Sequence, residues 1–183
     1  KKNEIPVHFY ERCDVTNEDE LNAFYEKLEG PVDVLVHSIA YAHPDTFAKP
    51  IRDVNLEEFS ATLAASSYSL LPVVRHTLPL MSNGGSVITL SYLGGQRVVA
   101  NYKLMGIASA GPVRTIAASQ ISGFDEMLLV YEAVAPMRRA ISQDDVADLS
   151  LFLSSDLSKN ITGQTLFVDA GYSILAMAEL PKA

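Results

Sequence analysis

This sequence predicts an α/β fold, in which a doubly wound parallel sheet carries helices on both faces. Three observations predict it. Short apolar runs typical of strands alternate with stretches whose apolar residues recur every three or four positions. One run, Val32 to Val36, is almost continuously apolar, as in a strand buried on both faces. The 183 residues, 48% of them apolar, suffice for one domain with its own core.

The first predicted elements are a strand and a helix. Val7 to Tyr10 is a short run typical of a strand. Between Leu21 and Leu28 the apolar residues stand three and four apart, which predicts a helix. Thr16 and Asp19 precede this helix at the spacing of a capping box. The strand at Val32 to Val36 then completes the first strand–helix–strand unit.

A loop that contains Pro and Asp, residues 43–53, leads into a longer helical pattern. An apolar stripe runs from Phe59 to Leu78, and Pro72 within it should kink or interrupt the helix. Gly84-Gly85 is typical of a turn, and the third strand is expected at Ser86 to Leu90.

The C-terminal part adds a helix and a last strand. Ser142 and Asp145 are expected to open a helix whose apolar stripe runs from Val146 to Leu153. Thr165 to Val168 is typical of a strand. This order implies parallel strands joined by right-handed crossovers, which is a Rossmann-like arrangement. We expect residues 1–183 to form a single domain of this type.

Composition excludes several classes of function. The net charge is −8 and no block of like charges occurs, which argues against nucleic acid or a membrane surface as partner. No apolar run approaches the ~20 residues of a membrane helix, and no signal-peptide core follows the first residues. The single Cys13 suits a reducing compartment such as the cytoplasm. The four His residues and Cys13 show no metal-ligand spacing, and the Gly-x-Ser-x-Gly elbow of Ser hydrolases is absent.

Residues capable of chemistry follow the predicted strands. Asp14 follows the first strand, Ser38 the second, Ser91-Tyr92 the third and Asp169 the last. In open parallel sheets, ligands bind beyond the carboxyl ends of the strands. The sequence therefore predicts a site at that edge of the sheet.

Tyr102 is the leading candidate for chemistry. A Tyr hydroxyl, with a pKa near ~10, donates a proton or a hydrogen bond to a developing oxyanion. Tyr102 is one of eight tyrosines, so an ordinary core or surface role is the competing interpretation.

Tyr102 lies in the segment Asn101-Tyr102-Lys103-Leu104-Met105-Gly106, and Tyr92 lies in Ser91-Tyr92-Leu93-Gly94. Both segments resemble those of the enoyl-acyl-carrier-protein reductases, which are divergent short-chain dehydrogenase/reductases. The resemblance implies hydride transfer from a reduced nicotinamide to the β-carbon of an enoyl thioester in fatty-acid biosynthesis. It also implies that Tyr102 polarises the thioester carbonyl and stabilises the enolate, with Tyr92 nearby.

The same resemblance implies the remaining site residues, an acyl carrier protein as partner and a homotetramer. Asp14 would accept from the adenine amino group, and the turn after His37 would pass beside the ribose and pyrophosphate, whereas His37 itself is more often structural than catalytic. The implied cofactor-binding residues are Asp14, Val15, Ser38, Ile39, Ala40, Pro112, Val113 and Thr115. The implied substrate-binding residues are Tyr92, Tyr102, Met105, Phe124 and Met127.

The chain departs from the family seven residues after Tyr102, where Ser109 replaces the lysine that holds the nicotinamide ribose. Lys103 does not substitute for it, because neighbouring helix residues point to different faces. The helix that opens at Asn101 also passes directly into a segment that follows the next strand in the family. We therefore expect roughly two dozen residues, the lysine among them, to be missing between Ala108 and Ser109. A true deletion is the alternative.

The glycine-rich loop that cradles a pyrophosphate is also missing. Gly84-Gly85 and Gly94-Gly95 lie at strand or loop edges rather than at a helix start. In the family this loop would precede Lys1, so we expect the first βαβ unit to be absent. The residues that select between NADH and NADPH lie there too, so NADH is the expected cofactor and NADPH stays open.

Two other functions compete with enoyl reduction. Ketoacyl reductases carry a lysine four residues after the tyrosine, where this chain has Gly106. A non-catalytic homologue, acting as a binding or assembly subunit, becomes the better interpretation if the junction is genuine. Arg138-Arg139 would attract an acidic carrier protein or form an internal salt bridge.

Overall fold

The computed structural model describes residues 7, 9–91 and 124–175 of the chain. Helices precede, separate and follow two short strands. The helices and strands are α1 (Glu18–Tyr25), β1 (Val34–His37), α2 (Asp45–Ala48), α3 (Leu56–Leu63), α4 (Leu70–Thr77), β2 (Ser86–Thr89), α6 (Phe124–Val134) and α7 (Gln143–Leu153). A π-helical turn spans Ala64–Tyr68, and 3₁₀ turns lie at Ile51–Asp53, Leu78–Leu80, Asp156–Ser158 and Tyr172–Ile174.

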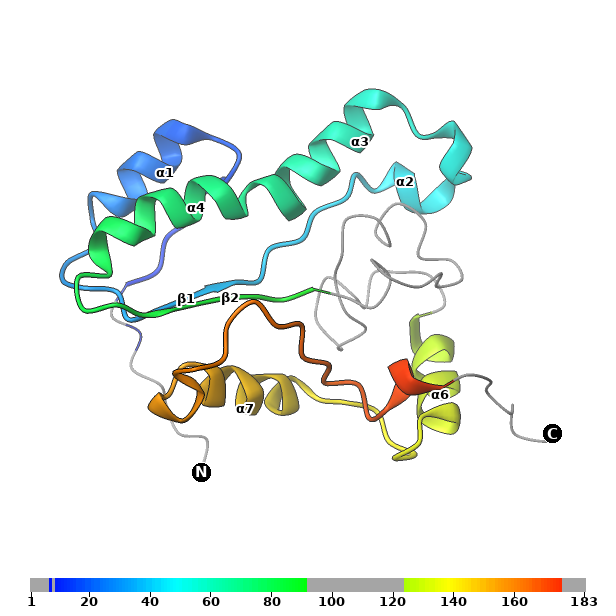
Figure 1. Cartoon of the computed structure of the whole chain (residues 1–183). Helices are drawn as coiled ribbons and strands as arrows, with labels where there is room; N and C mark the ends of the chain where they lie inside the picture. Colours follow the sequence, from blue (N-terminus) through cyan, green and yellow to red (C-terminus); the bar gives the residue numbers. More distant parts are fainter. Residues whose placement is uncertain (1–6, 8, 92–123, 176–183) are drawn as a thin grey trace.

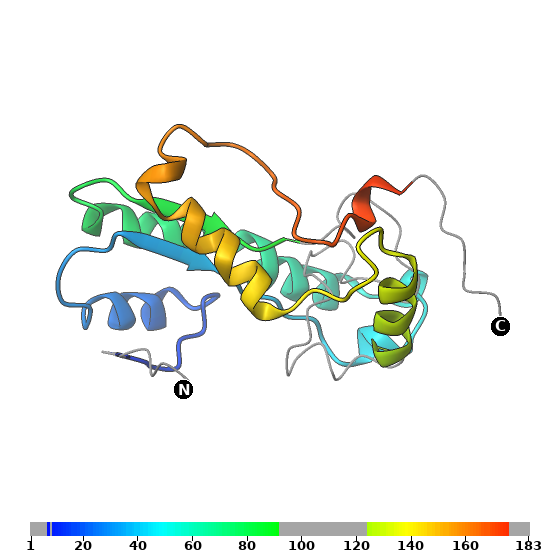
Figure 2. The same ribbon diagram turned by 90° about the horizontal axis from the view of Figure 1, so that it is seen from below.

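These elements are arranged in layers (Figures 1 and 2). α1 and α4 pack together above the strands, with α4 against β1, and α7 packs against β2 from the other side. β1 and β2 run parallel, with Val34 opposite Ser86 and His37 opposite Thr89. The predicted α/β fold with helices on both faces of a parallel sheet is therefore confirmed.

The prediction that the first of these strands is buried on both faces was wrong. Val34 and Val36 are 37% and 47% exposed, whereas His37 is only 3% exposed. The Ser86 hydroxyl donates to the Leu153 carbonyl, so the face that Ser86 shares with Val34 looks toward α7. Because α7 packs against β2, the part of this face that β1 contributes stays open.

Two other predicted strands are not formed. Val7, Phe9 and Tyr10, and likewise residues 165–168, lie outside any strand. Both segments have the composition of a strand, but a strand needs a hydrogen-bonded neighbour. Among the described residues β1 and β2 bond only to each other, so neither segment pairs with the sheet and neither becomes a strand.

The cap of α1 lies one residue later than predicted. The Asn17 Oδ1 atom accepts hydrogen bonds from the backbone N–H groups of Asp19 (3.0 Å) and Glu20 (3.3 Å). The hydroxyl of Thr16, the predicted cap, donates instead to Asp14 Oδ1 at 2.7 Å. Asn17 is therefore the residue that satisfies the free N–H groups of the first turn.

The long helix is interrupted, as Pro72 predicts, but the irregular turn lies before the proline. The Ser69 N–H donates to the Ala64 carbonyl at 3.0 Å, a bond that spans five residues instead of four. Pro72 has no N–H with which to continue the α-helical ladder to Tyr68. The break therefore separates α3 from α4 and leaves a π-helical bulge between them (Figure 1).

The C-terminal part has a small core of its own. Tyr131 of α6 and Ala135, the residue after this helix, pack with Ala170. The rings of Tyr131 and Tyr172 stack with centroids 4.7 Å apart. The Tyr131 hydroxyl donates to the Asp169 carbonyl. Burial raises the pKa of Tyr131 above its ordinary value, so its hydroxyl stays protonated as a donor.

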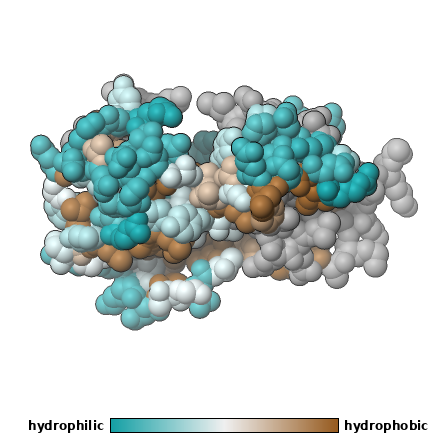
Figure 3. Space-filling model, turned by 90° about the horizontal axis from the view of Figure 1, so that it is seen from above, coloured by the Kyte–Doolittle hydropathy of each residue, from teal (hydrophilic) through white to brown (hydrophobic). Residues whose placement is uncertain are grey.

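The surface on the side of α1, α3 and α4 is mixed (Figure 3). Hydrophilic residues cover much of it, and hydrophobic residues gather in bands between them. Within the part of the chain that the structure describes, no helix combines the length and the apolar content needed to cross a membrane.

Candidate active site

The carboxyl ends of the two strands meet at one end of the sheet. The Leu90 N–H donates to the His37 carbonyl at 3.0 Å, which continues the pairing past the strand ends. The predicted turn Ser38–Ala40 follows directly. The segment before α1 turns on this side of the molecule, and α6 also lies beyond the strand ends (Figure 1).

His37 ends β1 with its ring in the interior. Its Nε2 atom lies 2.9 Å from Ser69 Oγ, and the Ser69 hydroxyl donates to the Ala65 carbonyl at 2.6 Å. Because the single hydroxyl hydrogen is used there, Nε2 carries the hydrogen that His37 donates to Ser69. Burial lowers the pKa of His37, which favours this neutral form. This geometry supports the interpretation of His37 as a structural histidine.

Ser66, which lies in the bulge itself, holds the far end of the turn. Ser66 Oγ accepts from the Tyr41 N–H and donates to the Tyr41 carbonyl, both at 2.9 Å. Ser66 and Ser69 are 7% and 0% exposed. Ser38 and Ala40, between the two anchored positions, are exposed. The turn therefore presents its middle to solvent while both of its ends are fixed.

Asp14 lies in a turn of its own. Its Oδ1 atom accepts from the Thr16 N–H (2.9 Å) and the Thr16 hydroxyl (2.7 Å), and its own N–H donates to Glu20 Oε2 (2.9 Å). The two hydrogen bonds from Thr16 lower the pKa of Asp14. Asp14 is thus an exposed, ionised acceptor in a fixed loop, and Val15 beside it is half-buried.

Asp14→Asn is expected to lower the free energy of unfolding at pH 7 by less than about 1 kcal/mol, because the carboxylate is exposed. The pKa of Asp14 is lower in the folded chain, so its stabilisation is present above the unfolded-state pKa and is lost as the pH falls through the folded-state pKa. Urea unfolding at pH 7 and at about pH 2, below ordinary carboxyl values, measures this. A difference between wild type and variant that persists unchanged at the lower pH would contradict the assignment.

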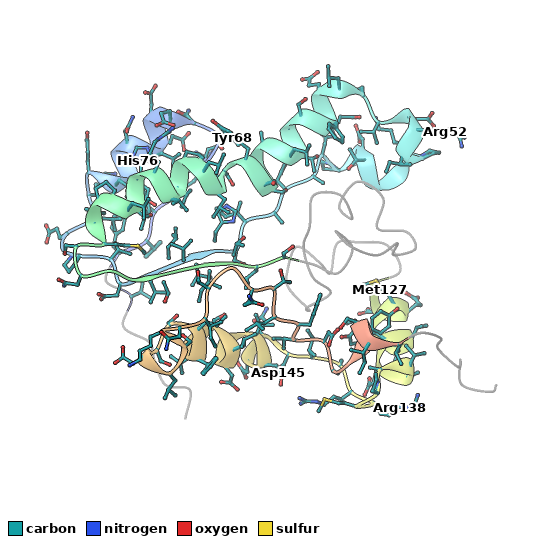
Figure 4. All side chains as sticks on the ribbon, viewed as in Figure 1. Arg52, Tyr68, His76, Met127, Arg138 and Asp145 are labelled. Carbon is teal, nitrogen blue, oxygen red and sulfur yellow. The ribbon has the colours of Figure 1, made fainter. Side chains whose placement is uncertain are left out.

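Two of the implied substrate-binding residues, Phe124 and Met127, lie within the described structure. Met127 is half-buried near the start of α6 (Figure 4), and Phe124 is the first residue of that helix. Six predicted site residues lie outside the described residues: Tyr92, Tyr102, Met105, Pro112, Val113 and Thr115. Of the predicted cofactor residues, Asp14, Val15, Ser38, Ile39 and Ala40 are described.

Sequence reasoning missed Ser66 and Ser69. Both lie in a helical stretch with the sequence Ala-Ala-Ser-Ser-Tyr-Ser, in which nothing separates a buried serine from an exposed one. The only available signal was the helix break expected at Pro72, because irregular helical turns often accompany functional sites.

The two arginines expected either to attract a carrier protein or to form internal bonds are both engaged within the chain. Arg139 lies 3.3 Å from Asp145 Oδ1, and Arg138 donates to the Ala133 carbonyl. Asp145 also completes the predicted capping box with Ser142, which begins α7. The internal salt bridge is therefore present at Arg139, whereas Arg138 bonds a backbone carbonyl near the end of α6 (Figure 4).

One group of potential metal ligands occurs among the described residues: His43, Asp45 and Glu58. Both Glu58 oxygens already have partners, since Oε1 accepts from Lys49 at 2.6 Å and Oε2 accepts from the Asn55 N–H at 3.0 Å. A cation would have to displace the Lys49 ammonium, so this group has the features of an ion pair with a helix cap.

The protein family is decided by comparison with known proteins. The family model described as enoyl-(acyl carrier protein) reductase matches residues 2–110 and 107–173. The chain belongs to this family. A member from Synechocystis, named enoyl-acyl-carrier-protein reductase (NADH), is 37% identical, and the match covers 90% of this chain and 74% of that protein. The corresponding match from Rickettsia prowazekii is 35% identical over 97% of this chain and 78% of the relative.

Solved structures of family members share the fold. The Bacillus cereus enoyl-acyl carrier protein reductase, solved with NADP+ and an indole naphthyridinone, matches with a TM-score of 0.85 at 36% identity. That match covers 90% of this chain and 75% of the other. The enzyme from Aquifex aeolicus matches with a TM-score of 0.83 at 35% identity.

The comparisons also bear on the junction after Ala108. The family model matches in two stretches that meet at residues 107–110. The Synechocystis alignment extends over 192 positions, which is more than the 183 residues of this chain. Family members therefore carry residues that have no counterpart here.

Proposed function

We propose that this protein reduces the trans-2 double bond of an enoyl-acyl-carrier-protein thioester with NADH in fatty-acid biosynthesis. One observation carries the proposal: the chain belongs to the enoyl-(acyl carrier protein) reductase family along nearly its whole length. Relatives at 35–37% identity are named as NADH-dependent reductases of this kind. The ten-residue spacing of Tyr92 and Tyr102 agrees with this function.

The described residues fit the adenosine half of a nicotinamide dinucleotide. Asp14 offers an exposed, ionised carboxylate that accepts an exocyclic amino hydrogen. Ser38 and Ala40 lie exposed at the carboxyl end of β1, where dinucleotides bind in sheets of this type. Val15 and Ile39 add half-buried apolar contacts. We propose Pro112, Val113 and Thr115 for the nicotinamide and phosphate groups.

The residues proposed for chemistry act on the thioester. Tyr102 donates a hydrogen bond to the thioester carbonyl and so stabilises the negative charge that develops on its oxygen. Tyr92 is proposed to orient the same group. Met105, Phe124 and Met127 bind the acyl chain and exclude water from it. Bound NADH would supply the hydride for the β-carbon.

The wider setting follows from the same proposal. The substrate arrives on an acyl carrier protein, and the functional unit is a homotetramer. The compartment is the cytoplasm, in agreement with one unpaired cysteine, Cys13. Residues 1–183 form one reductase domain, which lacks family residues between Ala108 and Ser109.

The assay compares two thioesters with NADH. Crotonyl thioester should drive NADH oxidation, and acetoacetyl thioester should not, because the lysine of ketoacyl reductases has no counterpart at Gly106. Oxidation with acetoacetyl thioester alone would overturn enoyl reduction in favour of carbonyl reduction. Absence of turnover with both thioesters would favour the non-catalytic homologue.

An intact mass must accompany the assay. These 183 residues weigh 19.9 kDa. A larger mass, with peptides mapping between Ala108 and Ser109, would support a segment that carries the lysine. A directly joined Ala108–Ser109 peptide would mean that this lysine is missing.

A further inference from the structure

We propose that the π-helical bulge Ala64–Tyr68 and the residue after it position the cofactor-binding turn Ser38–Ala40, with Ser66 and Ser69 as positioning residues. The proposal rests on the proposed function, because it assigns a purpose to the turn only if a dinucleotide binds there. It adds two residues that are 25 or more positions away from the turn in sequence.

The first argument is that the bulge and Ser69, the residue after it, hold both ends of the turn. At the start, His37 Nε2 donates to Ser69 Oγ over 2.9 Å. At the end, Ser66 Oγ bonds both the N–H and the carbonyl of Tyr41 at 2.9 Å. The three residues between these anchors are therefore fixed by bonds to one short helical segment.

The second argument is that burial alone does not fix the turn. Ser38 and Ala40 are exposed, and Tyr41 is 44% exposed. A turn with so little packing would sample several backbone conformations in the absence of hydrogen bonds. The hydrogen bonds from Ser66 reach backbone atoms, so they fix the path of the chain whatever the Tyr41 side chain does.

The third argument is the chemistry of the serines. Both side chains are buried in a helix, where an apolar residue would pack without needing a hydrogen-bond partner. Both hydroxyls are nevertheless fully used, since Ser66 bonds Tyr41 twice and Ser69 bridges His37 to the Ala65 carbonyl. Fully satisfied buried networks specify one conformation. The helix departs from α geometry at this point, which is common at functional sites.

The test uses Ser66→Ala, Ser66→Cys and the control Ser67→Ala. Alanine removes the hydroxyl, whereas cysteine keeps nearly the same volume but forms only weak hydrogen bonds. Ser67 serves as the control because it is exposed on the same bulge. We expect the dissociation constant for NADH, measured by nicotinamide fluorescence, to rise roughly tenfold in both Ser66 variants. Ser67→Ala should bind as wild type.

Two further readouts separate positioning from general loosening. The KM for NADH should rise in the Ser66 variants while the KM for crotonyl thioester stays within about twofold. Hydrogen exchange at the Tyr41 amide should accelerate, with the exchange of the helical amides of α7 unchanged.

The outcomes are distinguishable. Wild-type affinity for NADH in both Ser66 variants would overturn the positioning role alone. If Ser67→Ala lost as much affinity for NADH, the effect would come from helix packing, and the positioning role would be overturned. The same conclusion would follow if Ser66→Cys kept wild-type affinity. Failure of the wild-type protein to bind NADH would overturn the proposed function, and the positioning role with it.

Discussion

Replacing Tyr92 and Tyr102 together by phenylalanine is expected to lower kcat for enoyl-thioester reduction by about 100-fold or more, the loss typical of a missing acid or oxyanion donor. Phenylalanine keeps the ring and removes the hydroxyl. The lost hydrogen bond is strongest in the transition state, where charge gathers on the carbonyl oxygen. The dissociation constant for NADH should therefore stay near the wild-type value. Loss of NADH absorbance with saturating crotonyl thioester measures kcat, and nicotinamide fluorescence without the thioester measures the dissociation constant.

The matched control is Tyr68→Phe. Tyr68 is 60% exposed on the helical bulge (Figure 4), so removal of its hydroxyl should leave kcat unchanged. Tyr102→Phe alone should account for most of the loss if Tyr102 is the main donor. Retention of wild-type kcat in the double variant would contradict the assignment of chemistry to these two residues.

Gly85→Ala is expected to lower the free energy of unfolding by about 3 kcal/mol, at the upper end for overpacking. A Cβ atom at this position would lie 2.5 Å from the Asp33 carbonyl oxygen. That oxygen accepts a hydrogen bond from the Ser86 N–H at 2.9 Å, at the start of the β1–β2 ladder. Relief of the clash requires backbone movement, so it would weaken the pairing of the two strands. Urea denaturation followed by circular dichroism measures the change.

The adjacent glycine provides the comparison. Gly84 has a φ of +81°, but a Cβ atom there would meet nothing within 4 Å. Gly84→Ala should therefore cost about 1 kcal/mol, the strain of a left-handed conformation alone. If Gly85→Ala lowered the free energy of unfolding no more than Gly84→Ala does, the close approach to Asp33 would not be the cause of the destabilisation.

Local pattern was sufficient where the determinants of structure lie close in sequence. The apolar spacing after Leu21 predicted α1, and the Ser142–Asp145 capping box predicted the start of α7. Pro72 predicted the break between α3 and α4 because a missing N–H acts on its own helix. The cap of α1 was misplaced by one residue, because Thr16 and Asn17 both suit a cap and only the bond from Thr16 to Asp14 decides between them.

The residues of the predicted site also differ in whether local sequence or a distant contact reveals them. Asp14 and the turn Ser38–Ala40 were found because they follow strand-like runs and match a family motif. Their roles stay predictions, as do those of Tyr92 and Tyr102. The contribution of Ser66 was not predictable, because its partner Tyr41 is 25 residues away.

By itself the sequence determined the alternation of strands and helices, the family and the candidate residues, since these depend on periodicity and on short motifs. Only the tertiary structure decided which strand-like segments become strands. Val32 to Val36 found a partner in β2, whereas Thr165 to Val168 found none among the described residues, because strand formation depends on a neighbour and not on composition. The same dependence on distant partners explains why the bonds that hold the turn Ser38–Ala40 emerged only from the folded chain.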